Sequence, residues 1–193
     1  MAAVANHYRK GTGVFWGEMS PCDHFCQIYG DDGVFLDALE GYVGGGLRAG
    51  ESVIVIATHD HLDSLERRLE ALNVDVEAAR GDDRYIALSA EATLDRFMVN
   101  GWPNDERFAE TVRGIIGRAR ADGRKVRAFG EMVAVLWARG HYAATVRLEH
   151  LWNKLLENET FPLFCAYPKA GFTKGASESI RELHLAHSKV IAS

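Results

Sequence analysis

The sequence has few of the features that mark secreted, membrane-spanning or nucleic-acid-binding proteins. Three of its 193 residues are cysteine, and so small and odd a number favours a reducing compartment over a disulfide framework. No apolar run approaches the ~20 residues that span a bilayer, and residues 1–10 lack the apolar segment of a secretory signal. The 22 basic residues are outnumbered by 27 acidic ones and form no block, which argues against direct binding of nucleic-acid phosphates. We therefore expect a cytoplasmic protein that contacts neither a membrane nor nucleic acid directly.

The remaining composition is that of an ordinary globular protein, with 47% apolar and 25% charged residues. A chain of this length is about one domain and can bury about 70% of its unfolded surface, so it needs neither a disulfide nor a structural metal to fold. We expect a single domain over residues 1–193, in which residues 1–13 form a flexible extension.

Short β-prone segments alternate with amphipathic helical segments along the chain. Residues 52–57 are apolar on both faces, as is typical of a central parallel strand that helices cover on both sides. The alternation predicts an α/β fold with three α/β/α layers and a mainly parallel central sheet. In such sheets ligands bind beyond the carboxyl ends of the strands. The expected strands are 25–29, 52–57, 85–88, 126–129 and 162–167, and the expected helices are one between Asp31 and Gly50, about 60–72, about 92–99, one between Asn104 and Gly123, and about 133–138, 142–156 and 177–187.

The first expected helix contains three consecutive glycines, Gly44–Gly46. Inside a helix each glycine costs about 1 kcal/mol relative to alanine. The glycines indicate either a frayed helix end or a place where another backbone packs closely.

The turn after the first strand, Tyr29–Gly33, stands where a mononucleotide-binding fold carries its phosphate loop. Such a loop needs a Gly-Lys pair followed by a hydroxyl residue, but the dipeptide Gly-Lys occurs nowhere in the chain. Two carboxylates, Asp31 and Asp32, would also repel a triphosphate. We expect one of them to cap the next helix, and we take Tyr29 and Asp31 as candidate contacts for a small ligand.

Polar side chains follow the second strand in the sequence THDHLD. His59, His61 and Asp63 match the H-x-H-x-D-H pattern with which metallo-β-lactamase-like hydrolases hold zinc, but Ser64 replaces the last histidine. The alternative is a polar strand end that faces water or a small ligand. We favour this alternative, with Thr58, His59 and His61 as candidate ligand contacts.

Two other groups contain metal-ligand residue types. Cys22, His24 and Cys26 alternate along the chain, but in an extended strand the two cysteines are about 13 Å apart, too far to share one zinc ion. Only a tight turn before the strand would bring them together, and we favour small buried cysteines with a hydrogen-bonded histidine. His184 and His187, three residues apart on the last helix, are interpreted as a mixed surface and core face rather than a chelate.

Two further polar side chains end later strands. Glu131 follows the fourth strand, where a partly buried carboxyl could act as an acid or base or could hold the strand–helix turn by accepting backbone hydrogen bonds. We favour the structural role. Tyr167 ends the fifth strand, from which its hydroxyl can reach the same crevice.

Several segments spread over residues 14–191 form a joint pattern that is specific, although each segment alone is weak. They are Phe15–Gly17 leading into His24–Tyr29, Leu47–Glu51, Val55–Thr58, Phe97–Val99, Phe129–Val133, Leu136–Trp137, Leu148–Asn153, Cys165–Pro168 and the ending His184–Ile191. The pattern resembles the MEDS family, whose name combines methanogens and methylotrophs with the sensory domain of the dichloromethane-metabolism regulator.

The resemblance implies a fold related to RecA- and KaiC-type ATPases that has lost the phosphate loop. Those ATPases usually carry a catalytic glutamate after the second core strand, where this sequence has Thr58–Asp60, so both halves of an ATPase site are absent by this comparison. The resemblance also implies a sensory module that binds small molecules, with hydrocarbon derivatives among the proposed ligands. Such modules are often fused to histidine kinases or DNA-binding regulators. This sequence shows no such output domain, so we expect signalling through a separate kinase or transcriptional regulator.

We therefore predict a noncatalytic signal-sensing domain that binds a small, partly apolar molecule and uses no cofactor or metal. Two alternatives stay open. The first is a protein-interaction module without a ligand, which a stable homo-oligomer or an exposed apolar patch would favour; the second is a metal-dependent hydrolase or residual nucleotidase. The candidate ligand contacts are Tyr29, Asp31, Thr58, His59, His61, Glu131 and Tyr167.

Overall fold

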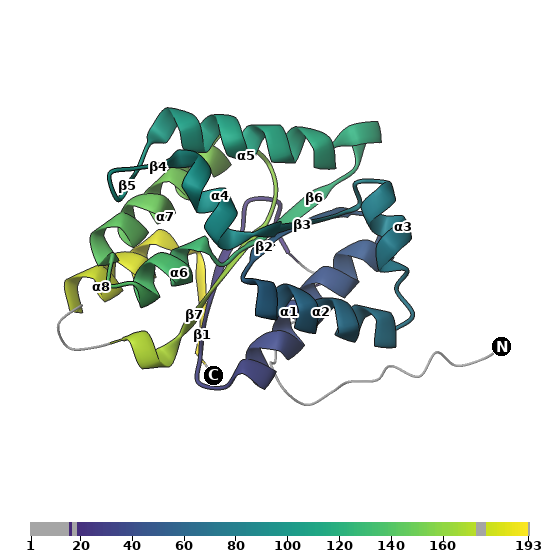
Figure 1. The fold of residues 1–193 in the computed structure, drawn as a ribbon, viewed down its shortest axis with the longest axis horizontal. Helices are drawn as coiled ribbons and strands as arrows, with labels where there is room; N and C mark the ends of the chain where they lie inside the picture. Colours follow the sequence, from purple (N-terminus) through teal and green to yellow (C-terminus); the bar gives the residue numbers. More distant parts are fainter. Residues whose placement is uncertain (1–15, 17–18, 173–176, 193) are drawn as a thin grey trace.

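A six-stranded sheet, in which every strand is parallel to its neighbours, forms the middle layer of the structure (Figure 1). The structure is a computed structural model that describes residues 16, 19–172 and 177–192, so the extension predicted for residues 1–13 lies outside the described residues. The strand order is β3-β2-β6-β7-β1-β8. The strands are β1 (His24–Tyr29), β2 (Ser52–Ala57), β3 (Tyr85–Ser89), β6 (Val126–Gly130), β7 (Leu163–Pro168) and β8 (Lys189–Ala192).

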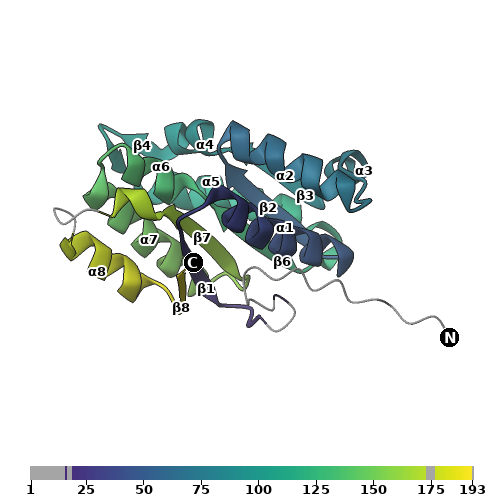
Figure 2. The same cartoon turned by 90° about the horizontal axis from the view of Figure 1, so that it is seen from below.

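Helices cover both faces of this sheet (Figure 2), which confirms the predicted three-layer α/β/α fold. Three helices share a buried apolar cluster with one face, and five share a second cluster with the other face. The first set is α1 (Asp32–Arg48), α2 (His59–Ala71) and α3 (Val76–Gly81), and the second is α4 (Ala90–Phe97), α5 (Asp105–Ala119), α6 (Met132–Ala138), α7 (Tyr142–Leu156) and α8 (Ser177–Ala186).

Side chains alternate between the two apolar clusters along the inner strands. On β7, Phe164 and Ala166 pack in the cluster of α1 and α2, whereas Cys165 and Tyr167 pack in the cluster of α6 and α7. Because both faces of the sheet are covered, the inner strands are apolar without polar alternation, as in other parallel sheets.

Side-chain caps fix the starts of two helices where the sequence predicts them. Asp31 Oδ1 accepts the backbone N–H of Val34 at 3.1 Å and caps α1. Asn104 Oδ1 accepts the backbone N–H of Arg107 at 3.0 Å and caps α5. Each cap satisfies one of the backbone donors that a helix leaves free in its first turn.

Helix α1 continues through Gly44–Gly46 to Arg48, so the alternative of a frayed end is wrong; the other alternative holds for the close approach, but the near atoms belong to side chains and not to another backbone. A Cβ atom on Gly46 would lie 2.7 Å from Nε of Arg127 on β6 and 2.8 Å from Cγ2 of Val53 on β2. The close neighbours are therefore side chains of the sheet, and glycine lets the helix approach them.

Three short elements are not predicted from the sequence: α3, β8 and a hairpin of β4 (Met98–Val99) and β5 (Trp102–Pro103). The helix expected to reach Val99 ends at Phe97, because the chain turns into the hairpin at Asn100 and Gly101, whose φ angles are 51° and 77°. Among the described residues, no helix combines the length and the apolar character needed to cross a membrane.

Candidate functional site

The carboxyl ends of β2 and β6 meet at the switch point of the sheet topology. From β2 the chain passes through α2 and α3 to β3 on one side, whereas from β6 it passes through α6 and α7 to β7 on the other side. Neighbouring strands whose connections leave in opposite directions open a crevice between them, and this is where open α/β sheets bind ligands. Thr58 and Glu131 are the first residues after these two strands.

Glu131 bridges the switch point. Its Oε2 accepts hydrogen bonds from the backbone N–H of Thr58 at 2.9 Å and from Oγ1 of Thr58 at 3.3 Å. Its Oε1 lies 2.7 Å from Nδ1 of His61. Because Glu131 is buried, this carboxylate ties the start of α2 to the end of β6, which agrees with the structural role favoured from the sequence.

The surroundings of His61 favour its charged form. Burial by itself would lower the pKa of this imidazole, but the hydrogen bond and charge of Glu131, aided by Asp32 and Asp60, outweigh burial and raise the pKa above its ordinary value. When His61 is protonated, its hydrogen bond to the carboxyl group of Glu131 is charge-assisted.

We expect this pair to make the stability of the protein depend on pH. Because the pKa of His61 is raised in the folded state, protonated His61 adds to the free energy of unfolding. This contribution is complete below the ordinary histidine pKa of about 6.5 and is lost as the pH rises through the raised pKa. Urea unfolding of the wild type and of His61→Gln, from about pH 6 to about pH 9, measures the difference in free energy of unfolding. That difference should shrink with rising pH, and a constant difference would contradict the assignment.

Aromatic rings continue the site from His61 toward β1. The ring of Phe35 lies edge-on to His61 at a centroid distance of 4.9 Å and stacks on Tyr29 at 4.7 Å. Burial, with added repulsion from Glu131 and Asp32, raises the pKa of the Tyr29 hydroxyl, so this group stays protonated. The structure thus brings Tyr29, His61 and Glu131 into one row.

Thr58 joins this row through its hydrogen bonds to Glu131, whereas Asp31, His59 and Tyr167 lie outside it. Asp31 and His59 are exposed, at the starts of α1 and α2. Asp63 is also exposed and His61 is paired with Glu131, so within the described residues His59, His61 and Asp63 make no shared ion position. Tyr167 points away from Glu131 into the layer between the sheet and α7, because Tyr167 shares the strand face of Cys165.

Tyr167 belongs to a second group of buried polar side chains. His24 on β1, Glu149 on α7, Cys165 on β7 and His187, which follows α8, place one ligand-type atom each within 4.8 Å of one another. The Tyr167 hydroxyl donates a hydrogen bond to Oε1 of Glu149. We call the four residues His24, Glu149, Cys165 and His187 the buried quartet.

Glu149 is the anion of the buried quartet. Burial alone would raise the pKa of this carboxyl, but the charge and hydrogen bond of His187, together with His24 and Tyr167, outweigh burial and lower the pKa to about 2. For His24 the effect of burial prevails, and its pKa is lowered to about 4. The protein interior therefore holds a carboxylate beside a neutral imidazole.

The sequence favours neither the Cys22 group nor the pair of His184 and His187 as a site, and among the described residues neither forms one. His24 is hydrogen-bonded and Cys26 is buried as expected, but Cys22 is exposed, which corrects the expectation that both cysteines are buried. Glu149 is not considered, although the sequence carries a signal for it. It falls four residues after Thr145 and three before Trp152, which places a carboxylate on the buried stripe of α7.

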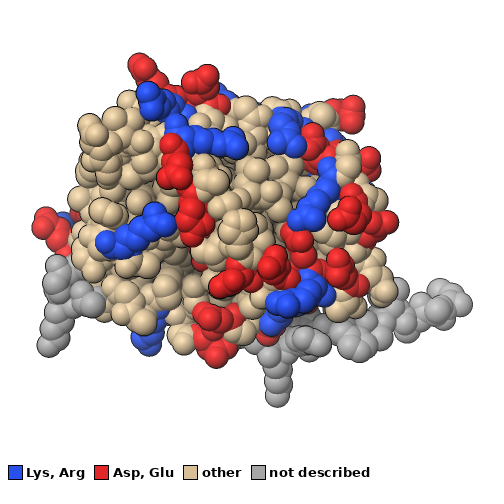
Figure 3. Space-filling model, in the orientation of Figure 1, with Lys and Arg blue, Asp and Glu red and all other residues tan. Residues whose placement is uncertain are grey.

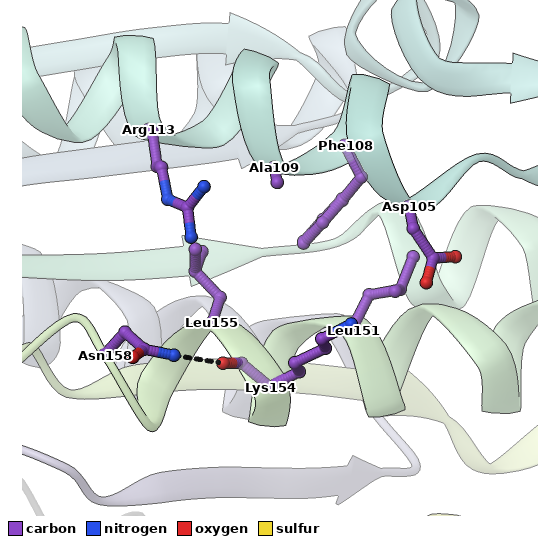
Figure 4. A pocket seen from close by; sticks show the side chains of 8 residues that line it. All are labelled: Asp105, Phe108, Ala109, Arg113, Leu151, Lys154, Leu155 and Asn158. Atoms are coloured by element: carbon purple, nitrogen blue, oxygen red, sulfur yellow. Dashed lines mark hydrogen bonds between the residues drawn. The ribbon is translucent and has the colours of Figure 1, made fainter.

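Two hollows of the described surface lie away from both groups. One of about 80 Å³ lies between α5 and α7, where Phe108 and Leu151 are flanked by Asp105 and Lys154 (Figure 4). A larger one of about 590 Å³ lies at the amino ends of the strands, and its lining includes Arg124 and other cations. Over the face in Figure 3, basic and acidic side chains are interspersed.

Comparison with known proteins gives one family. The family model described as "MEDS: MEthanogen/methylotroph, DcmR Sensory domain" matches residues 23–186, which include both groups of polar side chains except His187. No curated protein matches the chain.

Proposed function

Because the chain belongs to the MEDS family of sensory domains, we propose that it senses a small molecule at the switch point, in the crevice that is expected between the carboxyl ends of β2 and β6. The occupied state would be read by a histidine kinase or a transcriptional regulator, the output proteins that the family resemblance implies. The protein itself would carry out no chemical step.

The observation that carries this proposal is the bridge from Glu131 to Thr58 and His61 across the switch point. The bridge consists of charged and polar groups at the sheet position where α/β folds bind ligands. A ligand with a hydrogen-bonding end can compete for these groups, which an apolar strand junction would not offer.

The neighbouring rings favour a ligand that is partly apolar. Phe35 and Tyr29 stack beside His61, so one end of a bound molecule would meet aromatic surface while the other meets the charged pair. Small-molecule sites commonly combine apolar walls with a few placed polar groups. A hydrocarbon derivative with one hydroxyl, carbonyl or carboxylate group has this character.

The same bridge provides a way to pass the signal on. Glu131 starts the connection to α6, and Thr58 and His61 start α2, so a ligand that replaces one of these bonds changes how two helices on opposite faces are joined. Such a ligand shifts the protein between two states only if it binds one of them more tightly.

A second candidate function, docking of a protein partner without a ligand, has one observation in its favour. The β4–β5 hairpin exposes 39% of Val99 and 48% of Trp102, and exposed apolar side chains of this size are common at protein interfaces. The hydrolase alternative draws no support from the exposed His59 and Asp63.

Native mass spectrometry of the purified protein, followed by calorimetry with short-chain alcohols, aldehydes and carboxylates, tests the sensing proposal. We expect His61→Ala and Glu131→Gln to weaken binding by roughly 10–100-fold, because each removes one partner of a charge-assisted hydrogen bond. His150→Ala, an exposed histidine on α7, should leave the affinity unchanged. Full affinity in both crevice variants would exclude this crevice as the site.

A further inference from the structure

The buried quartet has the donor atoms of a transition-metal site. Its members come from four separate elements of the fold, β1, α7, β7 and the segment after α8, and all four side chains are buried. Two imidazoles, one thiol and one carboxylate are ligand types that zinc accepts.

Both imidazoles turn the same nitrogen toward the centre of the quartet. Nδ1 of His187 donates to the backbone carbonyl of Leu183 at 2.6 Å. Nδ1 of His24 donates to Oδ1 of Asn153 at 2.9 Å, since the amide nitrogen of Asn153 is committed to the carbonyl of Ala186 at 2.8 Å. These outer hydrogen bonds turn Nε2 of each ring inward, which is the usual arrangement of metal-bound histidine.

Two of the inward atoms lack a hydrogen bond of good geometry. Oε2 of Glu149 and Nε2 of His187 are buried with no such partner among the described residues. Unpaired buried polar atoms are rare in folded proteins and call for an explanation, such as a bound water or ion. Here two imidazole nitrogens, a thiol and a carboxylate face one another, an arrangement that a metal cation satisfies.

The distances fit a tetrahedral ion. Nε2 of His24 lies 3.4 Å from Sγ of Cys165 and 3.4 Å from Oε2 of Glu149, and Nε2 of His187 lies 3.3 Å from Oε1 of Glu149. Bonds of about 2.0–2.3 Å around a tetrahedral zinc place neighbouring donor atoms about 3.3–3.6 Å apart. Three donor distances thus already have the tetrahedral spacing, and since all four donor atoms lie within 4.8 Å of one another, the other pairs need to close by at most about 1.2–1.5 Å.

We propose that His24, Glu149, Cys165 and His187 bind one divalent transition-metal ion, zinc in the first place. Binding forms four metal–ligand bonds and releases to solvent the Cys165 thiol proton and any proton that His187 carries on Nε2, with no change of oxidation state. The thiolate and the carboxylate then balance the two charges of the ion. Tyr167 donates to Glu149 from outside and orients this ligand.

Four protein ligands leave no open position for water, so the ion is structural rather than catalytic. It ties the segment that leads into β8 to β1, β7 and α7. The quartet shares no residue with the crevice of Glu131 and His61, so a negative result for the metal leaves the sensing proposal untouched, and the reverse also holds.

The test uses the full chain without a histidine tag. We expect elemental analysis to find about one zinc per chain after purification without chelator. After the zinc is stripped, titration with Co²⁺ should give the intense visible bands of a tetrahedral ion and a thiolate-to-cobalt charge-transfer band in the near ultraviolet. X-ray absorption of the zinc form should show one sulfur and three nitrogen or oxygen neighbours.

Matched variants locate the ion. Cys165→Ser should abolish the charge-transfer band, whereas Cys22→Ser should retain it. His187→Ala should lower cobalt affinity by at least about 100-fold, since loss of an outer hydrogen bond alone costs about 10–100-fold, whereas His184→Ala should bind as the wild type does. No cobalt spectrum in the folded wild type, or a charge-transfer band that survives in Cys165→Ser, would overturn the proposal; if a variant fails to fold, the wild-type absorption spectrum decides.

Discussion

Replacing Trp152 with alanine is expected to lower the free energy of unfolding by about 3–5 kcal/mol, the usual cost of truncating a buried tryptophan. Trp152 on α7 is 1% exposed. Its ring meets Phe108 of α5 edge-on at 5.1 Å and lies against β6 beside Gly130. Alanine would leave a cavity where two helices and the sheet converge, and the midpoint of thermal unfolding should fall by roughly 6–20 °C.

Trp152→Phe provides the matched comparison. The indole N–H of Trp152 is buried without a hydrogen-bond partner among the described residues, so phenylalanine removes an unsatisfied donor while keeping an aromatic ring in place. For Trp152→Phe we expect the free energy of unfolding to fall by less than about 1.5 kcal/mol. Urea unfolding measures this free energy for both variants. If Trp152→Ala and Trp152→Phe lower it equally, the cavity is not the cause.

Replacing Glu51 with alanine is expected to lower the free energy of unfolding by about 3 kcal/mol, the second large effect. Arg127 lies on β6 with its side chain 6% exposed, and its Nε and Nη2 each lie 2.5 Å from Oε2 of Glu51. Arg127 also donates to the backbone carbonyl of Tyr42 at 2.9 Å. Without Glu51 a buried guanidinium loses its counter-charge, and the cost is that of the unpaired charge rather than of the lost bond.

Asp83→Asn is the control for Glu51→Ala. Asp83 pairs with Arg118 at 2.6 Å, but both side chains are at least one-third exposed, so removal of its charge should cost less than about 1 kcal/mol. Asparagine also tolerates the φ angle of 52° at this position. Added salt should weaken the effect of Asp83→Asn more than that of Glu51→Ala, because the buried pair is screened less. Urea unfolding at low and high salt measures the free energy of unfolding of both variants. If Glu51→Ala lowers it as little as the control does, Glu51 is not the counter-charge that Arg127 needs.

The sequence predicts those elements whose signal is local. The central strand Ser52–Ala57 and the start of a helix at Asn104 depend on neighbouring residues alone, and both are found as predicted. The hairpin at Asn100 and Gly101 is not predicted, although this dipeptide is a local signal that favours a two-residue turn between strands. β8 has no comparable signal: its four residues become a strand by pairing with β1, a contact across most of the chain.

The same distinction holds for the polar groups. Thr58 and Glu131 each follow an apolar strand, so a parallel sheet brings them to one edge, and the sequence suffices to nominate them. Tyr167 is nominated by the same rule, but the alternation of β7 turns it toward Glu149. The buried quartet could not be found from spacing, because its members are brought together by the order of the strands.

The place of β1 in the sheet also determines when it can fold. Its neighbours in the described sheet are β7 and β8, and His24 pairs with Leu163. At about 5–20 residues per second the ribosome needs roughly 7–28 s to make the roughly 140 residues between them. During this time β1, with Phe25 and Tyr29, has neither of its partner strands. β1 therefore stays unpaired in the nascent chain until β7 and β8 have been synthesised, and unpaired strand edges of this kind make a folding intermediate prone to aggregation.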